Sequence, residues 1–274
     1  MKEHFKNYEI KFCKRSCYFS RKKNFFISYP KSGRTWARFL VDAYKAELYG
    51  LRIKNVFKAE RRLRLKHHVE WTHLSAADMA DPYYAMVPEN LDLLERTPSV
   101  FMIRNFHATL ASAWFQVTAR LGFDVGDTDS FLRGVNYGAM HIISFFNSWI
   151  EIEKRLPPVK YVSYSRLKSD TKEEFIHILK SLDLPVDDAI VDRTLEMGSF
   201  DNMKRLATSA GYEGTPLAPT DRSNPNSAKV RSATSGGFRK VFTEEQIGYI
   251  NETIERHFVG LDDPRFAECI EEMS

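Results

Sequence analysis

The feature that most constrains the fold is a junction at residues 27–36, ISYPKSGRTW, where an apolar run turns into a helical pattern. Residues 24–29 (NFFISY) have the character of a short buried strand, and residues 35–49 (TWARFLVDAYKAELY) have the apolar spacing of a helix. The alternation recurs, with strands expected at 69–73, 99–104 and 160–164 and helices at 108–121, 139–155 and 171–182. Strands that alternate with helices predict an α/β fold with a central parallel sheet flanked by helices.

The chain has 274 residues, which could form one large α/β domain or two small ones. Because no low-complexity linker divides it, we expect a single domain over residues 1–274, with a basic N-terminal extension at 1–23. The stretch 206–238 is rich in Ser, Thr, Gly, Pro and Asn and is expected to be a mobile lid or loop. A helix should begin after Thr243, because Gln246 completes a capping box with it.

The charge and the cysteines limit the class of protein. The net charge of +4 is too small to predict a nucleic-acid partner, although it is compatible with small anionic ligands. No apolar run approaches the roughly 18–20 residues of a membrane span, and the N-terminus lacks the apolar stretch of a signal peptide. Cys13, Cys17 and Cys269 favour free thiols in a reducing cytoplasm, although Cys13 and Cys17 could form half of a metal site. We expect a cytoplasmic protein with no membrane partner.

The junction itself has the composition of an anion site. In parallel sheets, ligands bind beyond the carboxyl ends of the strands, and a tight turn there presents unpaired amide N–H groups at a helix N-terminus. Gly33 permits close approach of the backbone, and Lys31 adds a mobile charge. Ser32 and Thr35 add donors, and Trp36 could stack on a base. These residues predict a P-loop-like oxyanion cradle; the alternative is an ordinary junction with surface cations.

The position of the lysine distinguishes this turn from the usual nucleotide P-loop. That motif, G-x-x-x-x-G-K-[ST], has its lysine after the second glycine, whereas Lys31 precedes the only glycine here. YPKSGRTW is instead similar to the YPKSGTTW loop of the PAPS-dependent sulfotransferases, which grips the 5′-phosphosulfate of 3′-phosphoadenosine 5′-phosphosulfate (PAPS). The resemblance implies that residues 32–36 bind this co-substrate. It also implies that Lys31 stabilises the bridging oxygen of the leaving phosphate, and that Arg34, a departure from the commoner Thr, adds charge beside the anion.

A second match, SVFMIRNFHATLASAW at 99–114, implies a site for the 3′-phosphate. Taken alone, Arg104 at a strand end would more commonly pair with a carboxylate. The family, however, has an Arg-Asn-Pro-Lys-Asp segment here, and its Arg and a Ser eight positions later hold the 3′-phosphate. Arg104 and Ser112 match at that spacing, although Pro-Lys-Asp is replaced by residues 106–108.

The third match supplies a general base. WTHLS at 71–75 resembles the family's Lys-Thr-His-Leu-Pro, whose His takes a proton from the acceptor, and His73 occupies its place. A pKa near 6.5 suits that role at neutral pH. Trp71 replaces the Lys, which removes a cation that could neutralise the transferring group. His67 and His68, in the basic run RRLRLKHH, are expected to be structural or solvated.

Two weaker matches imply contacts with the adenine end. YSRLKSD at 164–170 is similar to Tyr-Glu-Asp-Leu-Lys-x-Asp, which makes Tyr164 the candidate. SFDNMK at 199–204 resembles Ser-Phe-Asp-x-Met-Lys and adds Ser199, Phe200 and Met203. Phe200 and Trp36 could then sandwich the purine, an arrangement that aromatic side chains favour.

The last match, KVRSATSGGFRKVFTEEQ at 229–246, is incomplete. Arg231 matches the family's Arg in the 3′-phosphate clamp, but Ser232 and Ala233 stand where Lys and Gly belong. The clamp therefore loses one cation, which Lys229 or Arg239 could replace. The family's dimer motif also falls here and is not retained, because Glu244 replaces Val and Gly248 replaces the final Glu, so the oligomeric state stays open.

The resemblance implies transfer of a sulfuryl group from PAPS to a hydroxyl or amine of a small-molecule acceptor, such as a natural product, with release of PAP and without a metal. The residues leave two alternatives, a nucleotide-dependent kinase and a non-catalytic homologue that only binds PAP or PAPS. The acceptor is expected to meet parts of 50–90, 125–150 and 206–238. Apolar walls there would suit an apolar alcohol or phenol, and carboxylates would suit a cation, although each aromatic residue alone is more commonly part of a core. The aromatic residues are Tyr83, Tyr84, Phe131, Phe145 and Phe146, and the carboxylates are Asp78, Asp81 and Glu89.

Overall fold

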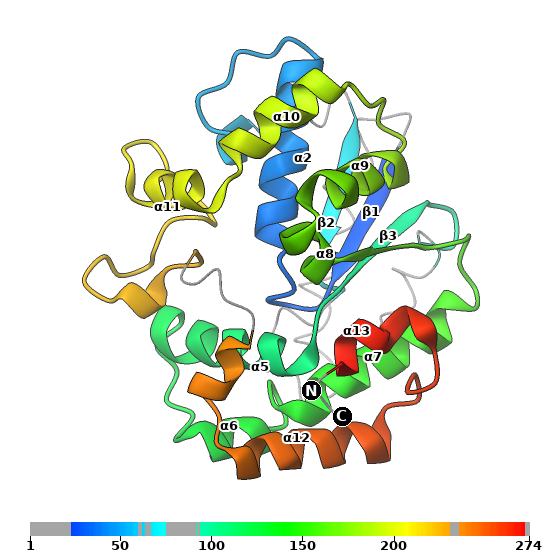
Figure 1. The fold of residues 1–274 in the computed structure, drawn as a ribbon, viewed down its shortest axis with the longest axis vertical. Coiled ribbons are helices and arrows are strands. Elements are labelled where there is room, and N and C mark those ends of the chain that lie inside the picture. The colour runs from blue at the N-terminus through cyan, green and yellow to red at the C-terminus, as the bar shows by residue number, and fades with distance from the viewer. Residues whose placement is uncertain are drawn as a thin grey trace, which may run out of the picture.

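The structure, a computed structural model, describes residues 23–59, 62–63, 67–74, 92, 94–230 and 236–271. Its centre is a parallel sheet of four strands, β1 (Lys23–Ser28), β2 (His68–Thr72), β3 (Ser99–Ile103) and β4 (Lys160–Ser163). The order is β2-β1-β3-β4, so the first strand lies inside the sheet between β2 and β3. The predicted parallel α/β sheet is confirmed (Figure 1).

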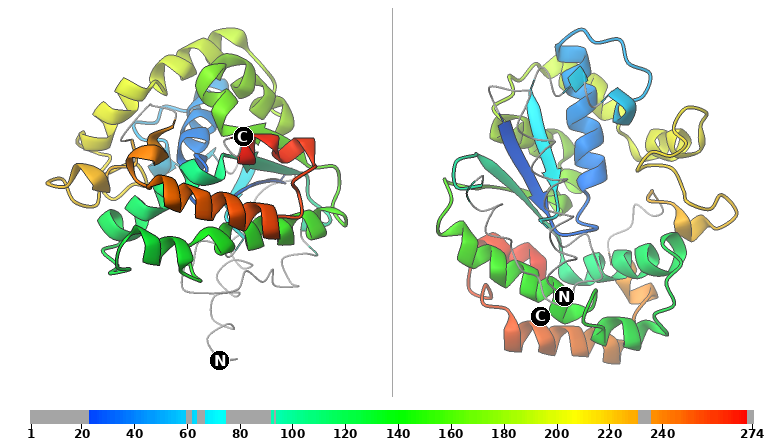
Figure 2. Two further views of the ribbon diagram at one scale, coloured as in Figure 1. Left: turned by 60° about the horizontal axis from the view of Figure 1, so that its bottom comes forward. Right: turned by 180° about the vertical axis from the view of Figure 1, so that it is seen from behind.

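Helices cover both faces of the sheet, because side chains along a strand point alternately to opposite faces. Phe26 and Met102 pack on one face with helices α2 (Arg34–Leu48), α9 (Thr171–Ser181) and α10 (Asp188–Met197). Phe25 and Phe101 pack on the other face with α5 (Phe106–Phe115), α7 (Ala139–Glu153) and α12 (Glu244–His257). Figure 2 shows the strands between these two layers of helices.

Helix α2 also packs away from the sheet. Its Phe39 and Ala43 form a separate apolar cluster with Met203 of α11 (Phe200–Thr208). The remaining elements are short: α6 (Thr128–Arg133), α8 (Tyr164–Ser169), α13 (Ala267–Ile270), the π-helix η2 (Gln116–Arg120) and the 3-10 turns η1 (Phe57–Ala59), η3 (Pro225–Ser227), η4 (Gly237–Lys240) and η5 (Pro264–Phe266). Within the described ranges, no helix is long and apolar enough to cross a membrane.

Side-chain caps determine where two of the helices begin. The predicted capping box is formed, since Thr243 Oγ1 accepts from Gln246 N at 3.2 Å and Gln246 Oε1 accepts from Thr243 N at 3.1 Å. The helix expected from residue 108 begins at Phe106 instead, because the Asn105 side chain caps it by accepting from Ala108 N at 2.9 Å.

Two expectations for the ends of elements were wrong. The strand expected at 160–164 stops at Ser163, whose side chain caps α8, so Tyr164 opens a helix rather than ending a strand. The segment expected to be a loop at 206–238 begins with the last turn of α11. Between residues 209 and 230 it consists of turns and η3.

Candidate active site

The cradle forms where β1 ends and α2 begins. The turn is tight: Ser32 N donates to Tyr29 O at 3.3 Å, and Lys31 and Gly33 have positive φ values of 72° and 100°. Helix α2 starts at Arg34 with no acidic residue in its first turn. Gly33 O accepts from Trp36 N at 2.9 Å, and the amides before Trp36 belong to the helix N-terminus, whose first N–H groups have no partner within a helix. The structure thus forms the predicted tight turn between a strand and a helix, which we call the cradle.

Gly33 is required by space as well as by conformation. A Cβ added at Gly33 would lie 2.2 Å from Cδ2 of Tyr164, so the Tyr164 ring packs directly on the turn. The Arg104 guanidinium lies 4.3 Å from the centre of that ring, and its Nη1 donates to Lys31 O at 2.6 Å. The ends of β1, β3 and β4 therefore bring residues 31–36, Arg104 and Tyr164 together, although these segments are far apart in the sequence.

Arg104 has the surroundings of an anion-binding residue. Its Nε is buried and finds no hydrogen-bond partner among the described residues. Burial is the main cause that lowers the pKa of its guanidinium. The alternative, an ion pair with a carboxylate, is not found in the part of the chain that the structure describes. Ser112, its predicted partner, is half-buried on α5, in the helix that follows the same strand.

Lys31 is held by a residue that the sequence did not single out. Its Nζ donates to Oε1 of Gln116 at 3.1 Å. Gln116 is the first residue of the π-helix η2, an irregularity frequently found at functional sites. Because an amide is neutral, it positions the ammonium without cancelling its charge.

His73 follows β2 directly and lies beside the end of β1. Its Nδ1 donates to the backbone oxygen of Ser28 at 2.7 Å. A carbonyl oxygen only accepts, so Nδ1 carries the proton and Nε2 of the neutral ring keeps its lone pair. Burial, followed by the nearby Arg34, holds the pKa of His73 well below its usual 6.5, so the ring is neutral at physiological pH.

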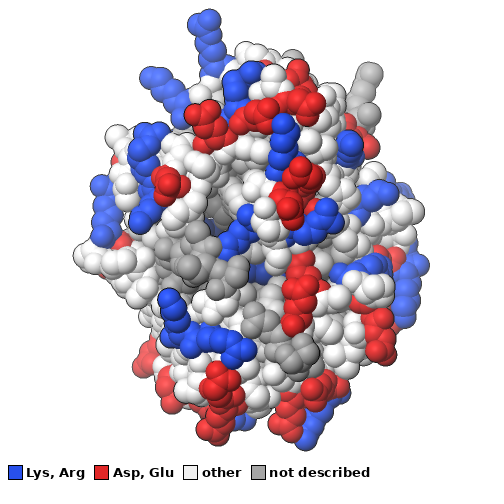
Figure 3. Space-filling model, in the orientation of Figure 1, with Lys and Arg blue, Asp and Glu red and all other residues white. Residues whose placement is uncertain are grey.

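The two cations proposed as replacements in the clamp lie in different places. Lys229 Nζ donates to Thr35 Oγ1 at 3.0 Å, inside the cradle. Arg239 is exposed, and its Nη1 donates to Glu244 at 3.1 Å. Of the two, Lys229 is the one that the fold brings to the turn between β1 and α2. Figure 3 shows Lys and Arg side chains in and beside a hollow near the middle of the face that Figure 1 also presents.

The sequence matches the Sulfotransferase domain family over residues 21–262. This chain is a member of the sulfotransferase family. It is 26% identical over 259 residues to sulfotransferase 1A1 of Bos taurus, covering 84% of this chain and 80% of the relative. It is 28% identical over 233 residues to sulfotransferase 1A1 of Canis lupus familiaris, covering 80% and 77%.

Solved structures agree on the fold of this sulfotransferase. Mouse sulfotransferase SULT7A1, solved in complex with PAP, superposes with a TM-score of 0.64 at 19% identity, covering 97% of this chain and 94% of that one. Retinol dehydratase, solved with androsterone and the inactive cofactor PAP, gives a TM-score of 0.55 at 16% identity, covering 86% and 80%. The α/β fold is thus shared with both solved structures.

The predicted adenine contacts of α11 follow a residue that Trp36 binds. Trp36 Nε1 donates to Gly198 O at 2.9 Å, which places the start of α11 beside the indole. Ser199 is the exposed N-cap of α11 and makes no side-chain cap, and Phe200 is half-buried next to it. Met203 is buried against Phe39 of α2.

Several predicted positions lie outside the described residues or in the core. Among the cofactor-binding candidates, Arg231, Ser232 and Ala233 are outside the described residues, as are Tyr83, Tyr84, Asp78, Asp81 and Glu89 of the acceptor regions. Phe131, Phe145 and Phe146 are each at most 1% exposed and pack in the core, which was the more common expectation for such aromatic residues. Within the described ranges, no cluster of three or more His, Cys, Asp or Glu residues could hold a metal ion.

Proposed function

We propose that this sulfotransferase transfers the sulfuryl group of PAPS to a hydroxyl or amine of a small-molecule acceptor and releases PAP, with His73 as general base. The observation that carries the proposal is the hydrogen bond from His73 Nδ1 to Ser28 O. It directs the basic Nε2 away from the backbone while the anion cradle lies at the end of the same strand. The family membership, and the PAP bound in the solved relatives, support PAPS as the donor.

The parts of the nucleotide are assigned to the groups that the fold gathers. The 5′-phosphosulfate would lie on Lys31, Ser32, Gly33, Arg34 and Thr35, where first-turn amides and cations meet. The 3′-phosphate would bind Arg104 and Ser112, and the adenine would lie among Trp36, Tyr164, Ser199, Phe200 and Met203. Arg231, Ser232 and Ala233 remain candidates for the 3′-phosphate on the strength of the resemblance alone.

The reaction is an in-line displacement at sulfur. The acceptor oxygen or nitrogen attacks sulfur while its proton passes to Nε2 of His73. The bond between sulfur and the bridging oxygen breaks, and its electron pair stays on the 5′-phosphate of PAP. Lys31 neutralises the charge that grows on that oxygen, which makes its interaction stronger in the transition state than in the ground state. Catalysis then depends mainly on positioning and on charge, as in phosphoryl transfer.

A non-catalytic PAP-binding homologue is the remaining alternative, because Trp71 stands where the family has a cation. The Trp71 ring packs on Phe26, with ring centres 4.5 Å apart, so its indole covers a face of the sheet and supplies no positive charge to an anion. The neutral His73, whose Nδ1 is bound to Ser28 O, supports a catalytic site, since a protein that only bound nucleotide would not need a base with a free lone pair.

The proposal is tested by incubating the protein with PAPS and a panel of acceptors, followed by mass spectrometry. The panel should contain phenols, apolar alcohols such as retinol and androsterone, and cationic amines. A gain equal to one SO₃ group on an acceptor, together with release of PAP, is the expected result. Tight binding of PAP without turnover of any acceptor would favour the non-catalytic homologue.

A further inference from the structure

Lys229 belongs to the segment between α11 and η4, yet it reaches the turn between β1 and α2. Its Nζ lies 3.0 Å from Thr35 Oγ1, the hydroxyl in the first turn of α2. The segment is anchored close by, because the half-buried Arg120 of the π-helix donates to the backbone oxygens of Ala218 at 3.2 Å and of Ser227. Lys229 is thus delivered to the cradle by a loop that Arg120 fixes in place.

The groups around Lys229 are mostly cationic. Arg120 faces it from η2, and Arg34 and Arg38 face it from α2. His73, at the end of β2, also lies within electrostatic reach. Arg38 is paired with Asp42 at 3.4 Å, and Glu70 acts on Arg34. In the described ranges, no carboxylate lies within ion-pair distance of Lys229.

Lys229 is half-buried, and an ammonium that is partly removed from water among arginines is unfavourable unless an anion compensates it. No sequence motif assigns a contact with the 5′-phosphosulfate to Lys229, and the cation that the family has three residues further on, in its 3′-phosphate clamp, is replaced by Ser232. We propose that Lys229 is an additional co-substrate-binding residue that contacts the 5′-phosphosulfate beside Thr35. The proposal rests on the proposed function, because it takes PAPS as the ligand of the cradle.

The proposal has a consequence for pH. Burial, then Arg120, Arg34 and Arg38, lower the pKa of Lys229 to about 8. A bound polyanion favours the charged amine and raises that pKa, so binding takes up a proton wherever the free amine is partly neutral. Nucleotide affinity is therefore full below the free pKa and falls as the pH rises above about 8. Burial lowers the pKa of Arg34 only to about 10, and the second pKa of the phosphates, about 6, is passed before this range begins.

Calorimetric titration with PAP tests this on the intact chain. The wild-type protein should lose affinity between about pH 7 and pH 9.5 and, near pH 8, take up about half a proton, measured in buffers of different ionisation enthalpy. Lys229→Arg should bind as tightly as wild type at neutral pH and lose the decline, because a guanidinium stays charged throughout. Lys229→Met should bind about 10- to 100-fold more weakly at neutral pH, again without the decline.

Lys180→Met, at an exposed position of α9, is the matched control and should behave as wild type. Thermal unfolding without nucleotide establishes that each variant is folded. If wild type binds PAP but Lys229→Met binds equally well and the wild-type profile is flat, the role of Lys229 is overturned while the proposed function stands. If wild type binds no PAP at any pH, both proposals are overturned.

Discussion

Among single residues, His73 shows how one backbone oxygen can decide which ring nitrogen carries the proton. The hydrogen bond to Ser28 O fixes the tautomer, and burial keeps the ring neutral. We expect His73→Ala to abolish sulfuryl transfer while leaving PAP affinity near the wild-type value, because no cofactor-binding role falls to this side chain. Turnover measured with PAPS, beside calorimetry with PAP, checks both halves. Substantial residual turnover would exclude His73 as the base.

The lowered pKa of His73 also predicts how activity falls at acidic pH. A base with a lowered pKa stays in its neutral, active form to lower pH than an ordinary histidine. The value of kcat/KM for PAPS reports the free enzyme, so its fall on the acid side should have an apparent pKa below 6.5. Return to neutral pH should restore full activity, which separates titration from unfolding. An acid limb at or above the usual histidine value would contradict the environment described for His73.

Lys31 is expected to act in the transition state. Lys31→Ala should lower kcat by about 10²-fold or more, because it removes a preorganised charge from the leaving oxygen. Single-turnover kinetics at saturating PAPS isolates the chemical step. Gln116→Leu is a useful comparison, since it retains the ammonium but removes the group that positions it, and should have a smaller effect. An unchanged rate in Lys31→Ala would remove Lys31 from the mechanism.

Residues whose roles depend on their neighbours in the sequence could be predicted, whereas residues whose roles depend on distant contacts could not. The strand, the turn and the helix around Gly33 follow from adjacent residues, so the cradle could be predicted. Gln116 could not, because its contact with Lys31 spans 85 positions and depends on a π-helix that no simple period reveals. Lys229 could be named only as one of two candidates, since its choice over Arg239 depends on the path of a loop.

At the scale of elements, the junction between β4 and α8 is fixed by two carboxylates. Glu174 of α9 accepts from Ser163 N at 2.6 Å, and Glu268 of α13 accepts from the Ser163 hydroxyl and from Ser165 N, the latter at 3.1 Å. Tyr164 lies between these serines and packs on Gly33. Helix α13 therefore helps to hold Tyr164 against Gly33, through the two serines that flank Tyr164.

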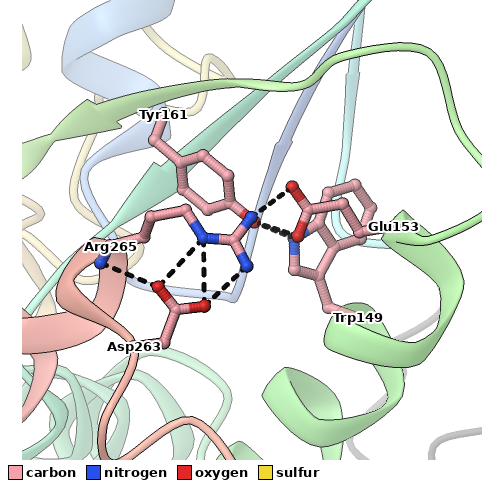
Figure 4. A network of polar contacts seen from close by, with 5 residues as sticks. All are labelled: Trp149, Glu153, Tyr161, Asp263 and Arg265. Atoms are coloured by element: carbon pink, nitrogen blue, oxygen red, sulfur yellow. Dashed lines mark hydrogen bonds and ion pairs between the residues drawn. The ribbon is translucent and has the colours of Figure 1, made fainter.

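The segment that carries Glu268 is itself anchored by the network in Figure 4. Arg265 donates to Glu153 of α7 at 2.6 Å and to Asp263, and Tyr161 of β4 donates to Glu153 at 2.7 Å. Trp149 completes the network by donating to the Tyr161 oxygen at 2.9 Å. The position of α13 is thus set from both the sheet and α7.

We expect Glu268→Ala to weaken PAP binding by loosening Tyr164, and to lower the free energy of unfolding by about 1–3 kcal/mol as its donors lose their acceptor. Glu268→Gln keeps an acceptor and should recover most of both losses. Calorimetry with PAP and urea unfolding measure the two effects. The role as a positioning residue predicts a raised KM for PAPS and a smaller change in kcat; a fall in stability with an unchanged KM would show a purely structural role.

At the scale of the whole molecule, the class of fold could be predicted because strand and helix periods alternate regularly along the chain. The order of the strands could not be read from those periods, since it depends on which edges pair over long distances. The acceptor side was the least predictable. Aromatic residues such as Phe131 of α6 and Phe145 and Phe146 of α7 occur both in apolar pockets and in cores. Here all three are buried in the core.

The site that results is assembled from residues 31–36, 104, 164 and 229, which come from separate elements. Parallel neighbours cannot be joined by tight hairpins, so each pairing in this sheet waits for a long crossover. Contacts of this separation form slowly in folding. The β1–α2 turn can take up its local shape early, but it gains Arg104, Tyr164 and Lys229 only when distant parts of the chain have docked. Affinity for the nucleotide therefore arises late in folding, and binding of PAP marks the molecules that have completed it.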